Sequence, residues 1–395
     1  MLERNVRELH KLGIREVLIA RRPGDDPLQH FCHPLPPSVK LTLVDADATD
    51  AFESLRAELT TDEFLLALEG HALNDRRVLK NLLQCNVSCA ILSPTGSQPG
   101  AAAILAACDS PLFDSPCCET LTGLLDAAIR DARINTLDLA SFQRHVINLR
   151  RKIEPFLLRV EHSAQLKEAD RVLRQTVHKG VLEFVGKYIH PPLEFGATRL
   201  LAKTSVTPNQ ITALWLSLAA ITIGLFATGH LLAGIILAAL CGVLDGIDGK
   251  LARLTLQFSK AGDVLDHVGG TVFDACWYLA LGWYFTGGQL NSTAGIFTAI
   301  LLISYIVERI IPGIFKKIHR AEIYDYAEID KLGRLVGSRM NNNVWFLMSG
   351  IILGFAREAF YGISLWMLAT ACWHLVRFFW VTWRTKARKP ALNRV

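Results

Sequence analysis

The sequence predicts a soluble α/β domain followed by an all-α membrane domain of six transmembrane helices. Hydrophobic residues fill 51% of the 395 positions and charged residues only 20%, and the mean hydropathy of +0.27 is high for a soluble protein. Uncharged runs long enough to cross a bilayer occur only after residue 210. We therefore divide the chain into an α/β domain over residues 1–150, a linker with an amphipathic juxtamembrane helix over 151–204, and a membrane domain with a basic tail over 205–395.

The first domain shows short apolar runs that alternate with helix-like stretches, which favours α/β. The amphipathic NVRELHKLG precedes the apolar GIREVLIA, and further apolar runs start at Lys40, Glu63 and Cys89. Stretches such as AFESLRAEL separate them, and a closing helix is expected from Glu119. The simplest assembly is a small sheet of mostly parallel strands covered by helices.

Charge and cysteine content exclude some classes of function. Lys and Arg exceed Asp and Glu by 42 to 37, which is too small a difference to indicate nucleic-acid binding and is explained equally well by a basic membrane face. The nine cysteines form no CxxC pair and no zinc spacing, so we expect reduced thiols of a cytoplasmic domain. The opening MLERNVRELHKLG is charged where a signal peptide has an apolar run, so we expect no secretion.

Residues 151–204 are charged and helical at first and amphipathic and basic later. The second part suits a helix that lies on the bilayer surface before the first span. A linker helix that packs against the soluble domain is the alternative.

The membrane domain contains six apolar segments, and an even number of spans places both termini on one side of the membrane. Basic residues of the loop after the fourth segment and of the tail indicate that this side is cytoplasmic. We expect a multi-pass protein of the cell (inner) membrane with both termini in the cytoplasm. The segments are about 211–229, 231–250, 264–286, 295–315, 344–360 and 363–383.

The turn between the second and third segments carries acidic residues at helical spacing. Asp245 and Asp248 stand at i and i+3, Arg253 follows about a turn later, and Asp266 opens the next segment. A carboxylate inside a membrane span costs about 2.5 to 3.5 kcal/mol on insertion scales, so a cluster needs compensating cations. Carboxylate oxygens are hard ligands that suit Mg²⁺, Mn²⁺ or Ca²⁺, and such ions neutralise phosphates.

At these residues the sequence resembles the CDP-alcohol phosphotransferase (CDP-alcohol phosphatidyltransferase) family, with its signature D-x2-D-G-x2-A-R-x8-G-x3-D-x3-D in a six-helix membrane domain. The resemblance covers about residues 175–383, including TPNQIT from Thr207 to Thr212. Paired Asp residues near a helix end are often a solvated cap, but fixed spacing across two spans favours the signature. Seven of the eight fixed positions match: Asp245, Asp248, Gly249, Ala252, Arg253, Gly262 and Asp266.

The resemblance implies transfer of a phospho-alcohol or phosphatidyl group from a CDP-alcohol to a second alcohol, with release of CMP. It implies Mg²⁺ or Mn²⁺ bound by Asp245, Asp248 and Asp266, a phosphate contact from Arg253, and room for the cytidine at Gly249 and Ala252. Gly262 is a further substrate-binding position, at which the absence of a side chain permits close approach of the ligand. The implied partners are a CDP-diacylglycerol or CDP-inositol type of donor, an alcohol or inositol-phosphate acceptor, membrane lipids and a second copy of the chain.

The eighth position departs from the signature, because Gly270 stands where the family has a fourth Asp, implied to be a metal ligand and the general base. Asp274, one turn deeper, either joins Asp266 in catalysis or is structural. His267 adjoins Asp266 but points about 100° away around the helix, so a role at lipid headgroups or the membrane interface is expected rather than base chemistry. The competing hypothesis is a catalytically impaired scaffold that binds a CDP-alcohol without turning it over.

Other polar residues of the membrane domain leave alternatives open. Glu308 and Arg309 either line an acceptor pocket, form an ion pair inside the bundle or extend towards the cytoplasmic edge of the membrane. The basic residues around the fourth span either bind a phosphorylated acceptor or set topology and attract anionic lipid. These are Lys316, Lys317, Arg320 and Arg339.

The first domain resembles a degenerate sugar-nucleotidyltransferase domain. LLALEGHALNDRRVLKNLL is similar to the strand, acidic turn and helix that follow the nucleotide site in those enzymes, but no glycine-rich loop precedes the first strand. We expect a domain that has lost cytidylyl transfer and now binds, docks or regulates. The fusion looks like the bifunctional enzymes that make CDP-inositol and join it to inositol phosphate.

Overall fold

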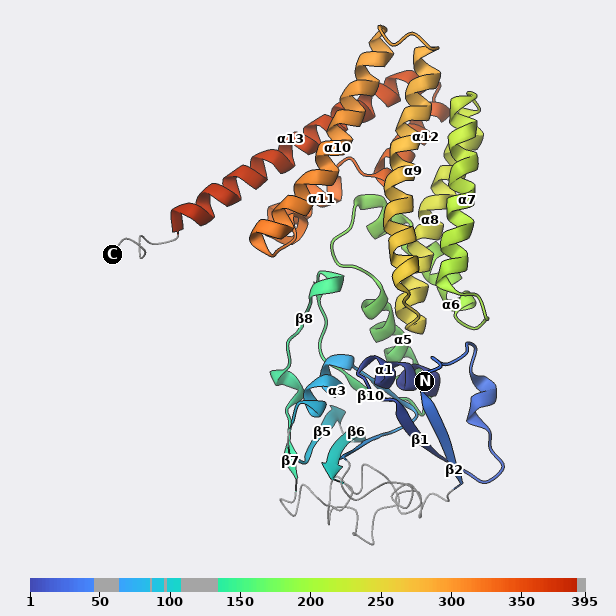
Figure 1. The fold of residues 1–395 in the computed structure, drawn as a ribbon, viewed down its shortest axis with the longest axis vertical. Helices are drawn as coiled ribbons and strands as arrows, with labels where there is room; N and C mark the ends of the chain where they lie inside the picture. Colours follow the sequence, from blue (N-terminus) through green and yellow to red (C-terminus); the bar gives the residue numbers. More distant parts are fainter. Residues whose placement is uncertain (46–63, 86, 96–97, 108–133, 389–395) are drawn as a thin grey trace. The chain divides into compact units, whose positions relative to one another are not determined.

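The computed structural model describes residues 1–45, 64–85, 87–95, 98–107 and 134–388 (Figure 1). They form two compact units. The first comprises Met1–Thr176 with Lys203–Ser205, and the second comprises Val177–Ala202 with Val206–Val395.

The first unit contains both helices and strands, as the predicted α/β class requires. Three of its helices are α1 (Leu2–Lys11), α3 (Arg76–Leu83) and α5 (Ser163–Val177). Its strands are β1 (Glu16–Arg21), β2 (Lys40–Asp45), β3 (Phe64–Leu68), β4 (Ala72–Asn74), β5 (Cys89–Thr95), β6 (Gln98–Ala107), β7 (Asn135–Thr136), β8 (His145–Val146), β9 (Arg151–Lys152) and β10 (Leu157–Arg159).

The described strands pair mostly antiparallel, so the expectation of a mostly parallel sheet is wrong. The four-stranded sheet has the order β3-β6-β5-β7, in which β6 runs antiparallel to both of its neighbours and only β5 and β7 are parallel. β1 and β2 form a separate parallel pair, and the pairs β4–β10 and β8–β9 are antiparallel. Parallel neighbours need a crossover of a dozen or more residues, and the sequence offers only two residues between β5 and β6.

The core of this unit lies between α1, α3 and the strands. Val6 of α1, Leu79 of α3, Ile91 of β5 and Leu157 of β10 are all buried in one apolar cluster. The segment LLALEGHALNDRRVLKNLL forms β3, β4 and α3, and Asp75 caps α3 by accepting a hydrogen bond from the Arg77 N–H. The order of strand, turn and helix agrees with the sequence, while the nucleotidyltransferase resemblance stays a prediction. AFESLRAEL and the helix expected from Glu119 lie outside the described residues.

The second unit is a helical bundle. Its helices are α6 (Pro191–Leu201), α7 (Pro208–Ala227), α8 (Leu231–Thr255), α9 (Lys260–Thr286), α10 (Thr293–His319), α11 (Glu328–Val336), α12 (Met340–Ile352) and α13 (Ala356–Arg388). α8 packs against α6, α7 and α12, α9 packs against α7 and α10, and α13 packs against α10 and α12 (Figure 1). The buried aromatic residues Trp215, Trp277, Tyr278 and Phe360 are among the largest side chains of its core.

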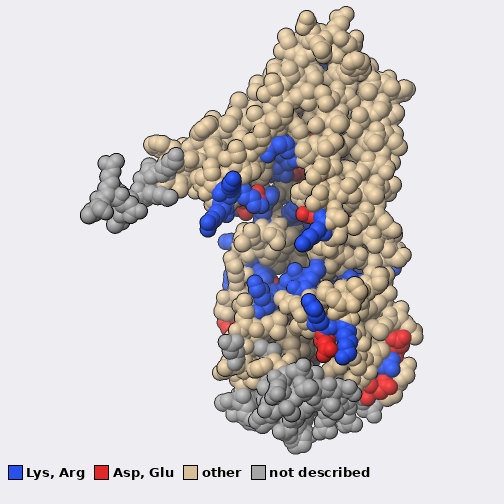
Figure 2. Space-filling view, in the orientation of Figure 1, with Lys and Arg blue, Asp and Glu red and all other residues tan. Residues whose placement is uncertain are grey.

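Four described helices are long and apolar enough to cross a membrane: α7, α8, α10 and the Ala356–Thr385 part of α13. The C-terminal end of α9 and the N-terminal end of α10 are joined near residue 290. On the face seen in Figure 2 these two ends carry almost no charged side chain. These features agree with an integral membrane protein, although the count of six spans is not confirmed. The predicted segment 344–360 is wrong as one helix, because α12 ends at Ile352, Gly354 has a φ of +83°, and α13 begins at Ala356.

Candidate active site

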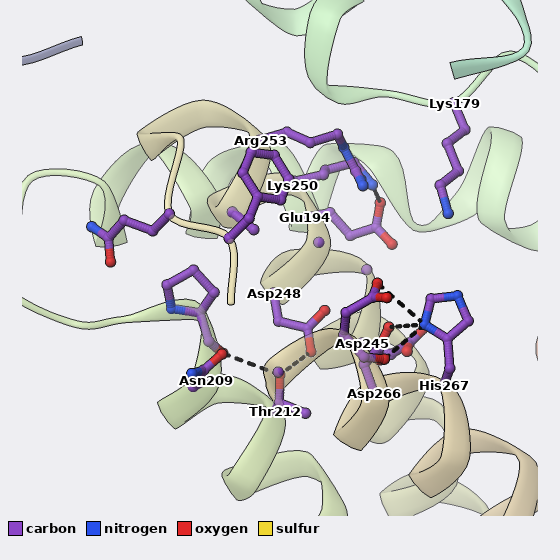
Figure 3. A pocket seen from close by; sticks show the side chains of 18 of the residues that line it. Lys179, Glu194, Asn209, Thr212, Asp245, Asp248, Lys250, Arg253, Asp266 and His267 are labelled. Atoms are coloured by element: carbon purple, nitrogen blue, oxygen red, sulfur yellow. Dashed lines mark hydrogen bonds and ion pairs between the residues drawn. The ribbon is translucent and has the colours of Figure 1, made fainter. Parts of the chain in front are cut away.

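Three carboxylates from two neighbouring helices meet in the second unit. Asp245 and Asp248 lie one turn apart on α8, and Asp266 lies in the second turn of α9. One oxygen of each carboxylate lies within 4.8 Å of those of the other two (Figure 3). The structure therefore brings together the three residues that the sequence predicted as metal ligands.

Ser259 and Thr207 fix the starts of the helices that surround this cluster. The Ser259 hydroxyl accepts a hydrogen bond from the Gly262 N–H (2.9 Å) and so caps α9. Thr207 caps α7 in a reciprocal capping box with Gln210. The Asn209 amide donates to the Ser259 hydroxyl (3.0 Å), which ties the two helix starts together.

Asp248 is held by two side chains of α7 that sequence reasoning did not identify. The Thr212 hydroxyl donates to Asp248 Oδ2 at 2.6 Å, and the Trp215 indole N–H donates to the same oxygen at 3.0 Å. Asp248 is only 5% exposed. Thr212 stands in the TPNQIT stretch and Trp215 is three residues later, but nothing in the sequence pairs either with Asp248.

The cluster fits a divalent cation. Oδ1 of Asp266 is buried and has no hydrogen-bond partner within the described part of the chain, so it is available to a ligand. Three carboxylates this close repel one another unless a cation lies between them. Their hard oxygen atoms match the preference of Mg²⁺ and Mn²⁺.

A pocket of about 510 Å³ surrounds the cluster. Gly249, Ala252, Arg253 and Gly262 line it together with the three carboxylates, so the seven residues that match the signature share one cavity. Figure 3 shows Arg253 and the three carboxylates in this pocket. Further lining comes from residues outside the signature: Lys179, Glu183, Glu194, Asn209, Thr212, Lys250, Ser259, His267 and Asn341.

Two glycines of the pocket are required by close approach of other side chains. A Cβ atom at Gly246 would lie 1.8 Å from Glu194 Oε1, and one at Gly262 would lie 2.2 Å from Asn209 Oδ1. Real Cβ atoms do not approach other atoms so closely, so any side chain at either position displaces its neighbour. Gly249 differs, because its nearest neighbours are the guanidinium nitrogens of Arg253 at 3.3 Å.

Cationic side chains stand on one side of the cluster in fixed positions. Arg253 Nε donates to the carbonyl oxygen of Val177 (2.7 Å), which holds the guanidinium over Gly249. Lys250 forms a buried ion pair with Glu194 of α6. Burial raises the pKa of Glu194, and Lys250 opposes that rise. Arg253 therefore presents a fixed positive charge beside the carboxylate cluster, while Glu194 balances the charge of Lys250.

The structure does not bring Asp274 to the cluster. Asp274 is 8% exposed, does not line the pocket and forms an ion pair with Arg309 of α10. Glu308 is hydrogen-bonded to His374 of α13 (2.6 Å), a contact that is an ion pair only when the imidazole is protonated. Glu308 and Arg309 therefore have separate partners within the bundle.

His267 and Gly270 complete the description of α9 near the site. His267 lines the pocket, and its Nδ1 is 3.7 Å from Asp266 Oδ2 and 3.5 Å from Asp263 Oδ1. The helical angle suggested that His267 turns away from Asp266, but the structure places its side chain at the pocket. A Cβ atom at Gly270 would have Trp215 as its nearest neighbour, at 3.8 Å.

Comparison with known proteins agrees with the signature. Residues 205–373 match the family model of CDP-alcohol phosphatidyltransferase. Over 187 residues the chain is 33% identical to the bifunctional IPC transferase and DIPP synthase of Thermococcus kodakarensis, a match that covers 46% of this chain and 40% of that protein. Over 90 residues it is 36% identical to the phosphatidylinositol phosphate synthase of Corynebacterium glutamicum, which covers 22% of this chain and 40% of that protein.

The chain thus spans less than half of the length of these two relatives. A crystal structure of the Mycobacterium tuberculosis phosphatidylinositol phosphate synthase with CDP-DAG bound is similar with a TM-score of 0.38 and 18% identity, over 52% of this chain and 98% of that one. Residues 205–373, which carry the carboxylate cluster, thus match the family model of CDP-alcohol phosphatidyltransferase.

Proposed function

We propose that this protein is an integral membrane transferase that moves a phospho-alcohol or phosphatidyl group from a CDP-alcohol to an acceptor alcohol and releases CMP. The observation that carries the proposal is the convergence of Asp245, Asp248 and Asp266 in a pocket of about 510 Å³ within the family-matched residues.

In this proposal Asp245, Asp248 and Asp266 hold Mg²⁺ or Mn²⁺. When bound, such an ion neutralises the donor diphosphate and stabilises the charge on the CMP leaving group. In this proposal Oδ1 of Asp266, which lacks a partner within the described residues, binds the ion, and the other oxygen accepts the proton of the acceptor hydroxyl, so Asp266 is the proposed catalytic carboxylate.

Other side chains bind and orient the donor. Arg253, fixed by the Val177 carbonyl, offers a planar fork of N–H donors to phosphate oxygens. Gly249 and Ala252 give the cytidine room to lie along α8, and Gly262 admits the Asn209 side chain at the other wall of the pocket. These contacts place the diphosphate beside the carboxylates and exclude water from it.

For the substrates, we propose a CDP-diacylglycerol or CDP-inositol type of donor and an alcohol or inositol-phosphate acceptor. The names of the relatives, a phosphatidylinositol phosphate synthase among them, support this choice. We further propose that both termini face the cytoplasm and that the protein forms a homodimer. The basic residues Lys316, Lys317 and Arg320 at the end of α10 support the orientation.

The test is CMP release from CDP-diacylglycerol and from CDP-inositol by the purified full-length protein with Mn²⁺ and a panel of acceptors, inositol phosphate included. We expect release by the natural sequence and a loss of at least about 10²-fold in Asp248→Asn. Glu328→Gln, on an exposed side chain of α11, is the matched control and should retain activity.

Two results would contradict the proposal. The first is the absence of CMP release with every acceptor, and the second is equal release by the natural protein and Asp248→Asn. Release that appears only in Gly270→Asp would instead support the non-catalytic scaffold, because that variant restores the fourth carboxylate of the signature.

A further inference from the structure

Thr212 and Trp215 on α7 both donate hydrogen bonds to the carboxylate of Asp248 on α8. Both donate to Oδ2, at 2.6 Å and 3.0 Å, and both are nearly inaccessible to solvent, with 3% and 2% of their surface exposed. Two donors on one oxygen fix the rotation of the carboxylate group, and so fix the direction in which its other oxygen points.

Trp215 also borders the position at which this chain departs from the signature. Its ring atom Cη2 would be 3.8 Å from a Cβ at Gly270, so the indole lies between the carboxylate that remains at 248 and the carboxylate that is missing at 270. With three carboxylates in place of four, the orientation of each one has more effect on cation binding, because fewer ligands share the ion.

We propose that Thr212 and Trp215 are positioning residues for cation binding by Asp248. This inference rests on the proposed function, since it takes Asp248 as a metal ligand. Neither residue is a fixed position of the signature, and both act through Asp248 rather than on the substrate. Loss of such a partner of a metal ligand typically weakens metal binding 10- to 100-fold.

The alternative is that Thr212 and Trp215 only pack the helices together and do not affect cation binding. Trp215 belongs to the bundle core and packs edge-on against Phe273, so its removal would disturb α7 whatever happens at the site. A packing role changes stability and leaves cation affinity unchanged. The variants must therefore remove the hydrogen bond and keep the shape.

Two substitutions, Thr212→Val and Trp215→Phe, meet this requirement, and Thr212→Ser is their control. Thr212→Val replaces the hydroxyl by a methyl group of similar size, Thr212→Ser keeps the hydroxyl, and Trp215→Phe keeps an aromatic ring without the N–H donor. Mn²⁺ binding to each purified full-length protein in detergent micelles is measured by calorimetry without substrate, and the kcat and KM of CMP release are measured separately.

We expect Thr212→Val and Trp215→Phe to bind Mn²⁺ about 10- to 100-fold more weakly than the natural protein. Thr212→Ser should bind it as the natural protein does. In an Asp248→Asn background, Thr212→Val should cause no further loss, because the residue through which it acts has changed.

The inference is overturned if Asp248→Asn weakens Mn²⁺ binding while Thr212→Val and Trp215→Phe do not. It is also overturned if Thr212→Val weakens binding equally with and without Asp248. If Thr212→Val does not fold, Trp215→Phe alone decides between the two roles. Failure of the proposed function is a different result, in which the natural protein neither binds Mn²⁺ nor releases CMP.

Discussion

Glu194 of α6 and Lys250 of α8 form an ion pair whose side chains are only 4% and 6% exposed. The pair stands at the wall of the pocket, and the other oxygen of Glu194 occupies the space beside Gly246, where a Cβ would lie 1.8 Å from it. Helix α6, which precedes the first span, is therefore bound to the same stretch of α8 that carries Asp245 and Asp248.

Gly246→Ala tests this close approach. The added methyl group must displace the Glu194 carboxylate, so we expect a loss of about 1 to 3 kcal/mol in stability and weaker CMP release. Gly224→Ala on α7 is the matched control, because no atom lies within 4 Å of the Cβ it introduces. Thermal unfolding in detergent measures both, and equal midpoints for the two variants would show that Glu194 does not hold α6 in this position.

Removing one member of the Glu194–Lys250 pair leaves a buried charge without its partner. We expect Lys250→Met alone to cost about 3 to 5 kcal/mol, and the double variant Glu194→Gln/Lys250→Met to cost less than Lys250→Met. The measurement is the unfolding midpoint of both single variants and the double variant. A double variant that is less stable than either single variant would contradict the pairing.

His190 predicts a dependence of stability on pH. Burial lowers its pKa from 6.5 to about 4, with Glu183 opposing and Lys250 adding to the effect, and its Nε2 accepts a hydrogen bond from the Trp345 N–H (3.3 Å). The unfolded chain takes up the proton first as pH falls from 6.5 towards 4, so the folded state loses about 1.4 kcal/mol per pH unit in this window and nothing above it.

The check is the unfolding midpoint of the natural protein and of His190→Gln between pH 7.5 and 5. The variant should lose less stability than the natural protein as the pH falls. Parallel curves would mean that the pKa of His190 is the same in the folded and the unfolded chain.

Asp274→Asn separates a structural from a catalytic role. Because Asp274 pairs with Arg309 outside the pocket, we expect a loss of about 1 to 3 kcal/mol in stability with unchanged Mn²⁺ affinity. Thermal unfolding and calorimetry measure the two effects. Weaker Mn²⁺ binding at unchanged stability would place Asp274 in the active site after all.

The sequence was sufficient where the relevant residues are close together in the chain. Asp245 and Asp248 share a helical face because of their spacing, and Asp266 follows at the start of the next helix, so their convergence could be predicted. Thr212 and Glu194 could not be placed, because their contacts with Asp248 and Lys250 depend on how α7 and α6 pack against α8. Periodicity fixes the face of a helix but not its neighbour.

The same limit explains the errors elsewhere. Apolar alternation identifies strands but not their direction, and the short connection between β5 and β6 was the signal that should have indicated an antiparallel pair. The apolar segment 344–360 contains the end of α12, which hydropathy alone does not indicate, because it carries no information on the positive φ of Gly354. The pairing of Asp274 with Arg309 joins two helices, so helical spacing alone could not distinguish it from a position in the site.

The most direct test of the carboxylate cluster is calorimetric titration of the purified protein with a cytidine diphosphate compound, with and without Mn²⁺. We expect nucleotide binding to require the ion and to be weakened in Asp245→Asn, Asp248→Asn and Asp266→Asn. Nucleotide binding that is equally tight without the ion and in all three variants would contradict it.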